Sequence, residues 1–348
     1  MQQNSYLENG YVNAQMWFDD AAPFIVALGG RGIGKTFGAL AALTDPDRTG
    51  KFVYMRRTQA QIDACKIPEL NPFKSINSAL QRDFVVSPLG KYSAGVYHSF
   101  INDDGQQRAA GDAVGLCIAL SVFSNIRGVD GLGYDTILYD EFIPEAHERP
   151  IRNEGAAFLN CYETLNRNRE LQGQQPLKCI LLSNSNNLAS PILEALGLIA
   201  AIEKMQRTGK RVSHVSKAIS VYLYPDSPIS SQKRSSVLYT VSNNADFSSM
   251  ALDNAFSKAN YEYVEQRPLA EYQPLVSIGK VTVYKHKSER SFYVIEGVRA
   301  AEQYTLLPLS IKAFRRDYYY LYEALLNGAM RYSTATVKIR FEEVWKNG

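Results

Sequence analysis

The stretch Phe24–Thr36 reads FIVALGGRGIGKT, and it decides the fold of the N-terminal part of the chain. Five apolar residues lead into a loop that matches G-x-x-x-x-G-K-[ST] at every fixed position. Glycines let successive backbone N–H groups curl around a phosphate, because bulkier residues could not adopt the required backbone angles. Phe37–Leu43 then has the composition of a helix, and the dipole of a helix N-terminus attracts phosphate. The stretch therefore predicts a strand, a phosphate-binding loop (P-loop) and a helix.

The loop supplies most of the residues that we expect to bind a nucleotide. Lys35 is predicted to reach the β- and γ-phosphates, and the hydroxyl of Thr36 is predicted to bind Mg²⁺. Arg31 is predicted to fix the loop's backbone or to contact phosphate within the same chain. A glycine-rich turn without a ligand is the alternative. The predicted nucleotide-binding residues are Gly29, Gly30, Arg31, Gly32, Ile33, Gly34, Lys35 and Thr36.

A second motif, Thr136–Glu141 (TILYDE), predicts what happens to the nucleotide. Its apolar residues indicate a buried strand, and Asp140 and Glu141 stand at the carboxyl end, where ligands bind in parallel sheets. We expect Asp140 to hold Mg²⁺. A glutamate at the position of Glu141 is typical of ATPases that activate water by general base chemistry. The N-K-x-D motif that reads guanine is missing, which argues against a GTPase switch.

Three further residues are candidates for the catalytic site. Asn184 ends an apolar run at the position where ATPases of the additional-strand class carry a γ-phosphate sensor, although a plain turn is the alternative. Arg127 and Arg167 could stabilise the charge that develops in the transition state. A finger contributed by a neighbouring subunit can be worth roughly 10³–10⁵ in rate. Each arginine could instead cap a helix or pair with a surface acid.

Strands alternate with helices through the first two-thirds of the chain, which predicts a parallel sheet. Lys91–Asn102 alternates like one arm of an antiparallel hairpin with its turn at Asp103–Gly105, and we expect it as an insertion at a sheet edge. The expected helices follow the P-loop, span Glu154–Arg167 and begin at Ser190. The expected strands are Phe24–Leu28, Phe52–Met55, Phe84–Ser87, Gly115–Leu120, Thr136–Asp140 and Lys178–Ser183.

The composition changes after Tyr224, where the breaker-rich run Pro225–Ser231 begins. We therefore predict a P-loop ATPase domain over residues 1–205, a linker region over 206–245 and a small α+β domain over 246–348. The elements expected in the last domain are a short helix from Asp246, strands over Pro274–Ile278, Val281–His286 and Ser291–Ile295, a helix with Tyr318–Tyr320, and one more strand and helix.

Composition bounds the class of protein. The 348 residues are 45% hydrophobic and 21% charged, as in globular proteins. No apolar run reaches the about 18 residues that span a bilayer, and no signal peptide is evident, so we expect no membrane association. The four cysteines form no C-x-x-C pair, and we expect buried free thiols in a reducing compartment.

Charge is unevenly distributed along the chain. Residues 1–200 hold 17 basic and 21 acidic side chains, a balance of −4, and residues 201–348 hold 21 and 14, a balance of +7. A basic second half favours a polyanionic partner, with scattered surface lysines as the alternative. The densest basic stretch supplies the predicted DNA-binding residues Lys204, Arg207, Lys210 and Arg211, because duplex DNA is held without sequence preference through its phosphates. A solvated helix end and loop is the other interpretation of this stretch.

Several motifs occur in the order seen in the DNA-packaging ATPases of phi-twenty-nine-like tailed bacteriophages, which are related to the large terminase ATPases. The chain resembles that family over nearly its whole length, and the combination is more specific than any single motif. The stretches that carry the resemblance are Gly29–Thr36, Phe52–Arg57, Asp135–Ile143, Arg167–Glu170, Leu182–Asn184, Met250–Asn254 and Leu326–Tyr332.

The resemblance implies an α/β fold: an additional-strand, catalytic-glutamate P-loop ATPase with a RecA-like parallel sheet, then a small α+β RNase H-like domain without nuclease activity. It implies a homopentameric ring that works in the host cytoplasm, at the portal or connector of a prohead, and is absent from the mature virion. The ring would use ATP and Mg²⁺ to pump double-stranded DNA into the capsid. Because some relatives need a structural RNA, the resemblance leaves that partner open.

The resemblance also assigns residues. Lys35 and Thr36 fall on the Walker A pair, and Asp140 and Glu141 fall on the Walker B pair. Arg167 falls at the position proposed for the trans-acting finger. Arg127 falls where a relative has a second basic trans residue, there a lysine. Gln59 also stands where that relative has a lysine, which puts any role of that position in doubt.

An RNase H-type nuclease needs about three carboxylates around two metal ions. The strands expected over Leu275–Ile278 and Val281–Tyr284 supply none, and Glu296 and Asp317 are poor substitutes alone. We therefore predict no cleavage of DNA. The alternative functions are a large terminase with a working nuclease, a DNA helicase or translocase of the same ATPase class, and a binding module without ATP turnover.

Overall fold

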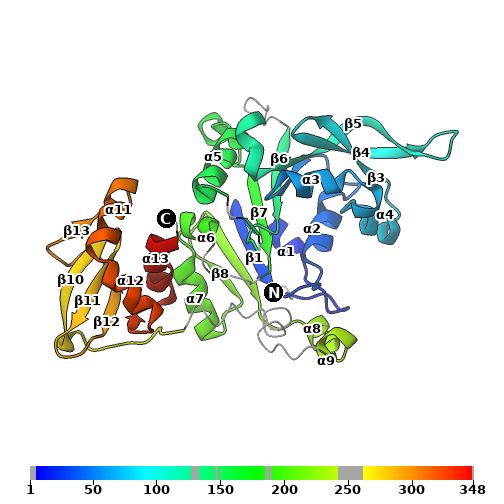
Figure 1. Cartoon of the computed structure of the whole chain (residues 1–348). Coiled ribbons are helices and arrows are strands. Elements are labelled where there is room, and N and C mark those ends of the chain that lie inside the picture. The colour runs from blue at the N-terminus through cyan, green and yellow to red at the C-terminus, as the bar shows by residue number, and fades with distance from the viewer. Residues whose placement is uncertain are drawn as a thin grey trace. The chain divides into compact units, whose positions relative to one another are not determined.

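A computed structural model describes the chain apart from residues 1–4, 127–132, 146–147, 150, 185–187, 189, 242–261 and 347–348. The chain divides into two compact units, Met1–Phe256 and Ser257–Gly348, each with a sheet of its own (Figure 1). Within the described ranges, no helix combines the length and the apolar character that crossing a membrane requires.

The first unit contains one nine-stranded mixed sheet. Its strands are β1 (Phe24–Gly29), β2 (Lys51–Arg56), β3 (Phe84–Gly90), β4 (Ser93–Ile101), β5 (Gln107–Ala119), β6 (Tyr134–Asp140), β7 (Lys178–Ser183), β8 (Val212–His214) and β9 (Ile219–Tyr224). Their order is β3-β4-β5-β2-β6-β7-β1-β9-β8. The strands from β5 to β9 in this order run parallel, and antiparallel pairs complete both edges.

Helices lie against both faces of this sheet (Figure 1). On one side are α1 (Gln15–Asp19), α2 (Lys35–Leu43), α3 (Gln59–Cys65) and α4 (Lys74–Leu80). On the other are α5 (Glu154–Asn166), α6 (Pro191–Ala195) and α7 (Ile199–Thr208). Because both faces are covered, the central strands are nearly continuous apolar runs; Ile25, Val26, Ala27 and Leu28 of β1 are all buried.

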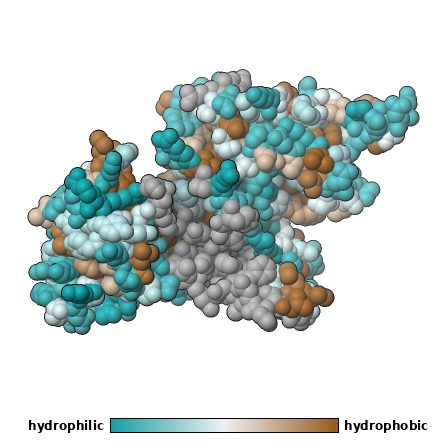
Figure 2. Space-filling view, in the orientation of Figure 1, coloured by the Kyte–Doolittle hydropathy of each residue, from teal (hydrophilic) through white to brown (hydrophobic). Residues whose placement is uncertain are grey.

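Two short helices end the described part of this unit, α8 (Pro228–Lys233) and α9 (Val237–Val241). The apolar side chains Val237, Leu238 and Val241 of α9 are exposed. They form the brown patch at the lower right of Figure 2.

Most of the predicted elements of the first unit are confirmed. All six expected strands form, and α6 begins as expected, with the Ser190 hydroxyl accepting a hydrogen bond from the Leu193 N–H. The hairpin is confirmed too, because β3, β4 and β5 pair antiparallel at the sheet edge. The linker interpretation of 206–245 is wrong where β8 and β9 form. Ile219–Tyr224 is an apolar run that pairs with β1 inside the sheet, and the chain breakers begin only after it.

In its described residues, the second unit has a five-stranded sheet and three α-helices. Its strands are β10 (Tyr272–Ile278), β11 (Val281–His286), β12 (Phe292–Glu296), β13 (Gln303–Tyr304) and β14 (Met330–Tyr332), in the order β13-β10-β11-β12-β14. The helices are α11 (Pro308–Asp317), α12 (Tyr319–Leu326) and α13 (Ala335–Lys346). The antiparallel pair β10–β11 confirms the predicted tight turn.

Two predictions for the second unit need comment. The three tyrosines were expected inside one helix, but Tyr318 separates α11 from α12. Its ring stacks on Phe314 in the core, so packing places the break there. The short helix expected from Asp246 lies outside the described residues.

Candidate nucleotide-binding site

The sheet order brings the three predicted motifs to one edge. Strand β7 lies between β1 and β6 and pairs parallel with both. The carboxyl ends of the three strands therefore meet, and each continues into a motif: the P-loop after β1, Glu141 after β6 and Asn184 after β7. This is the edge at which parallel sheets bind ligands.

The P-loop has the backbone shape that its glycines predict. Gly32 and Gly34 have φ angles of 69° and 89°, in the left-handed region that costs glycine little. Gly34 immediately precedes α2, so the loop ends at a helix N-terminus. The N-terminal segment supports the loop, because the Val12 N–H donates to the Ile33 carbonyl at 3.0 Å.

Lys35 is buried and folded back onto the loop. Its Nζ donates to the carbonyl oxygens of Gly29 and Gly30, at 2.7 Å each, and to Oδ1 of Asn184 at 3.2 Å. Burial lowers the pKa of Lys35 to about 7, against the opposing charges of Asp140 and Glu141. An anion at the loop would give this ammonium a stronger partner than a carbonyl.

Thr36 and Asp140 join the first two motifs. Oγ1 of Thr36 donates to Oδ1 of Asp140 at 2.9 Å, and the Tyr54 hydroxyl donates to Oδ2 at 3.1 Å. Burial raises the pKa of Asp140, and the charge of Arg56 opposes that rise. A hydroxyl and a carboxylate side by side are the oxygen ligands that Mg²⁺ takes beside a nucleotide. The residues present therefore fit that ion.

Arg56 is a site residue that we did not predict. It ends β2, the strand beside β6, and its guanidinium donates to Oδ2 of Asp140 at 3.1 Å while forming an ion pair with Glu141. The sequence did contain a signal for this role, because Arg56 is a basic residue at the carboxyl end of an apolar strand. The next residue, Arg57, lies on the opposite face and is fully buried against Glu154, with its Nε 2.7 Å from Oε1.

Glu141 projects from a sharp turn at the end of β6. Its φ of 54° is unusual for a residue with a side chain. The turn is held from β7, because Phe142 N–H donates to the Leu182 carbonyl and Ile143 N–H donates to the Ser183 hydroxyl, both at 3.3 Å. The carboxylate is left 52% exposed. It can therefore meet a water molecule, as a general base must.

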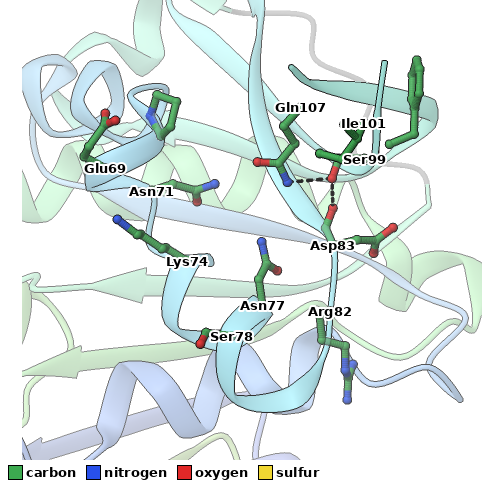
Figure 3. A pocket seen from close by; sticks show the side chains of 12 residues that line it. Glu69, Asn71, Lys74, Asn77, Ser78, Arg82, Asp83, Ser99, Ile101 and Gln107 are labelled. Atoms are coloured by element: carbon green, nitrogen blue, oxygen red, sulfur yellow. Dashed lines mark hydrogen bonds between the residues drawn. The ribbon is translucent and has the colours of Figure 1, made fainter. Parts of the chain in front are cut away.

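These groups surround a cavity of about 400 Å³. Its lining residues are Tyr11, Arg31, Gly32, Gly34, Lys35, Thr36, Phe37, Asp140, Glu141, Ser183 and Asn184. A second cavity, of about 600 Å³, lies between α4 and the hairpin (Figure 3). There Gln107 donates to the Ser99 hydroxyl at 2.7 Å, but no residue of the three motifs lines this cavity. The chemistry therefore belongs to the first cavity.

Of the two candidate arginines, the structure describes Arg167 but not Arg127. Arg167 is exposed just past the end of α5, with a φ of 46°, and does not line the cavity of its own chain. Arg127 lies outside the described residues. Arg31 lines the cavity and forms an ion pair with Glu145.

The predicted DNA-binding residues are all exposed. Lys204 and Arg207 lie on α7, and Lys210 follows its end. Arg211 is engaged with an acid, because one of its nitrogens lies 2.9 Å from each carboxylate oxygen of Asp226. Arg211 therefore forms a surface ion pair with Asp226 in this structure.

The sequence also matches a known family. Residues 9–279 match the family described as podovirus DNA encapsidation protein (Gp16). The chain belongs to this family. The DNA packaging proteins of Bacillus phages PZA and phi29 are each 26% identical to it over 244 residues, which is 69% of this chain and 64% of theirs. The matched region thus spans less than two thirds of these curated relatives.

Solved structures extend the likeness to both units. The chain is similar to one in the bacteriophage phi29 viral genome packaging motor assembly, with a TM-score of 0.65, 19% identity, and coverage of 97% of this chain and 99% of that one. The phi28 gp11 DNA packaging motor gives a TM-score of 0.62 and 16% identity over 96% of each chain. At such identities the likeness concerns the fold. The family match and the curated relatives confirm the predicted resemblance to the DNA-packaging proteins of phi-twenty-nine-like phages.

Proposed function

We propose that this family member is an ATPase that moves double-stranded viral DNA into a preformed prohead. The observation that carries the proposal is the joining of Thr36 to Asp140 at 2.9 Å, with Glu141 directly beside them on an open cavity. This arrangement offers a phosphate-binding loop, a metal-binding pair and a candidate base within one pocket. Because the chain belongs to a DNA encapsidation family, we infer that the polymer it moves is DNA.

Each residue has a role in ATP hydrolysis. The N–H groups of the P-loop and the Nζ of Lys35 bind the β- and γ-phosphates. Thr36 and Asp140 would hold Mg²⁺, which neutralises phosphate charge when bound. Glu141 accepts the proton of the water whose oxygen forms the new bond to the γ-phosphorus, and the bond to the β-phosphate oxygen breaks, leaving ADP and phosphate. Asn184, already 3.2 Å from Nζ of Lys35, orients the γ-phosphate.

A ring explains the position of Arg167. Because it is exposed and does not line its own cavity, it can serve the cavity of a neighbouring subunit. We propose a homo-oligomer, a pentamer on the family resemblance, with Arg167 as the trans finger. The first proposed partner is duplex DNA, which Lys204, Arg207 and Lys210 would help to hold. The second is the prohead portal, at which the motor would work in the host cytoplasm. A structural RNA is a third partner in some systems.

For the second unit we propose an RNase H-like ancestry without nuclease activity. Its two candidate carboxylates are paired with arginines. Arg340 lies 2.7 Å from Glu296, and Arg316 lies 2.7 Å from Asp317. Within the described ranges, no group of three potential metal ligands gathers. We propose that this unit instead contacts DNA or the portal.

The decisive experiment is packaging of DNA into proheads with purified protein and ATP. We expect protected, capsid-length DNA with the parent protein and none with Glu141→Gln, which keeps the shape of the side chain but cannot accept a proton. ATP turnover without protected DNA, together with strand separation in a helicase assay, would favour a helicase instead. A preparation that never hydrolyses ATP in the presence of DNA and proheads would contradict the proposal.

A further inference from the structure

A lysine from a distant part of the chain lies on the P-loop. Lys233, the last residue of α8, donates from Nζ to the carbonyl oxygen of Arg31 at 3.0 Å. A Cβ atom on Gly32 would lie 2.0 Å from this nitrogen. The ammonium therefore occupies the space beside Gly32 that a side chain would take, and Gly32 itself lines the nucleotide cavity. The G-x-x-x-x-G-K-[ST] pattern does not include such a residue.

Helix α8 is fixed to the loop through the N-terminal segment. The Ser227 hydroxyl caps the helix by accepting from Ile229 N–H at 3.2 Å, and it donates to the Gly10 carbonyl at 3.4 Å. A Cβ on Gly10 would lie 3.0 Å from Cβ of Pro228. Two residues later, Val12 is hydrogen bonded to Ile33 of the P-loop. The helix, this segment and the loop thus form one connected structure within the first unit.

Three cationic side chains gather around the loop, and one of them, Arg31, is already paired with Glu145. Lys35 and Lys233 both lie against residues of the loop, and within the described part of the chain the ammonium of Lys233 is hydrogen bonded to a neutral carbonyl. A phosphate oxygen carries negative charge, so it adds a Coulombic attraction to the ammonium that a neutral carbonyl oxygen does not supply. A phosphate oxygen at the cavity would therefore be a better acceptor for Lys233 than Arg31 O is. A flexible lysine stem allows its ammonium to change partners.

We propose that Lys233 binds the terminal phosphate of ATP in its own subunit and so makes the position of α8 depend on the nucleotide. The inference rests on the proposed function, because it requires ATP in this cavity. It assigns to this site a third cationic side chain, after Lys35 and Arg31, and takes it from the segment that follows β9. It also explains why α8, the helix directly before α9, lies against the loop: the contact brings Lys233 to the nucleotide.

Equilibrium binding tests this without turnover. The affinities of Lys233→Ala, Lys233→Arg and the parent for ATP and ADP are measured by calorimetry in the Glu141→Gln background. We expect Lys233→Ala to bind ATP about 10- to 100-fold more weakly, the range for one charged hydrogen bond, and ADP within about threefold of the parent. Lys233→Arg should recover part of the loss. Arg234→Ala, which removes the neighbouring exposed charge, is the matched control and should change neither affinity.

The outcomes separate this inference from the function on which it rests. If the parent background binds no ATP, the proposed function fails. If the parent binds ATP and Lys35→Ala does not, but Lys233→Ala binds as the parent does, only the role of Lys233 fails. An equal loss for ATP and ADP would overturn the assignment to the terminal phosphate. Hydrogen exchange provides a second readout: ATP should slow exchange of the α8 amides in the parent and not in Lys233→Ala.

Discussion

Arg56 and Glu141 form an ion pair at the edge of the nucleotide cavity, and the same guanidinium donates to Asp140. One side chain from β2 thus holds both carboxylates that end β6. The ion pair uses Oε2 of Glu141, so a water molecule can approach the other carboxylate oxygen while this contact stays closed. Because Glu141 is half exposed, the contact is of the solvent-screened kind that costs at most about 1 kcal/mol to break.

Removing Arg56 should destabilise the fold. Asp140 is buried, and in Arg56→Ala it would keep only the hydrogen bonds from Thr36 and Tyr54. We expect the free energy of unfolding to fall by about 1–3 kcal/mol, measured by urea denaturation, with partial recovery in Arg56→Lys. Lys66→Ala is the control, because Lys66, just past the end of α3, pairs with the exposed carboxylate of Asp63. Its effect should stay within about 0.5 kcal/mol. Equal stabilities would contradict the role of Arg56.

The neighbouring pair Arg57–Glu154 should matter more for stability. The side chains are 0% and 2% exposed, and Arg57 also contacts Glu148. Arg57→Ala leaves the buried charge of Glu154 without its partner and should lower the free energy of unfolding by about 3–5 kcal/mol. Glu154→Gln leaves Arg57 paired with Glu148 and should lower it less. The double variant should lose less than the sum. A loss below about 1 kcal/mol for Arg57→Ala would show that water reaches the pair.

The cysteines should react slowly in the folded protein. All four are buried and free, and burial raises the pKa of Cys65 from 9.0 to about 11. Since the folded state keeps the thiol protonated where the unfolded chain has lost the proton, the free energy of unfolding should fall as pH rises from about 9 to 11. Modification by a thiol reagent at pH 8, followed by mass spectrometry, should label four cysteines only after denaturation. Rapid labelling of the native protein would disprove this.

Arg167 should act between subunits. In assembled motors, Arg167→Ala should lower the rate of ATP hydrolysis by roughly 10³-fold or more and leave ATP affinity unchanged. Rings mixed from Arg167→Ala and Lys35→Ala subunits should regain part of the rate, because an intact cavity can then face an intact arginine. Absence of any recovery would indicate that Arg167 works within its own chain.

The protein should not cut DNA. Glu296 and Asp317 are engaged by arginines, and two-metal cleavage requires several carboxylates free to bind metal ions. Supercoiled plasmid incubated with the protein and Mg²⁺ or Mn²⁺ should stay supercoiled on agarose gels. Nicking that disappears in Glu296→Ala would refute this and restore the terminase alternative.

Site residues could be predicted where they lie together in one short stretch of sequence at the end of a strand. The P-loop, Asp140 and Glu141 are found at the cavity because each follows directly from an apolar strand whose end is fixed by the parallel sheet. Asn184 was predictable for the same reason. The linker assignment failed because a six-residue apolar strand such as β9 carries no local sign of which strand it will pair with.

By itself, the sequence determined the local chemistry: glycines where the backbone must turn left-handed, a lysine and a hydroxyl at the start of a helix, and two acids at the end of a buried strand. Only the tertiary structure decided which distant cations meet them. Arg56 reaches the acids because β2 pairs with β6, and Lys233 reaches the loop because α8 packs on the N-terminal segment. Spacing along the chain sets a residue's own backbone, but contacts between remote residues depend on how strands and helices pack.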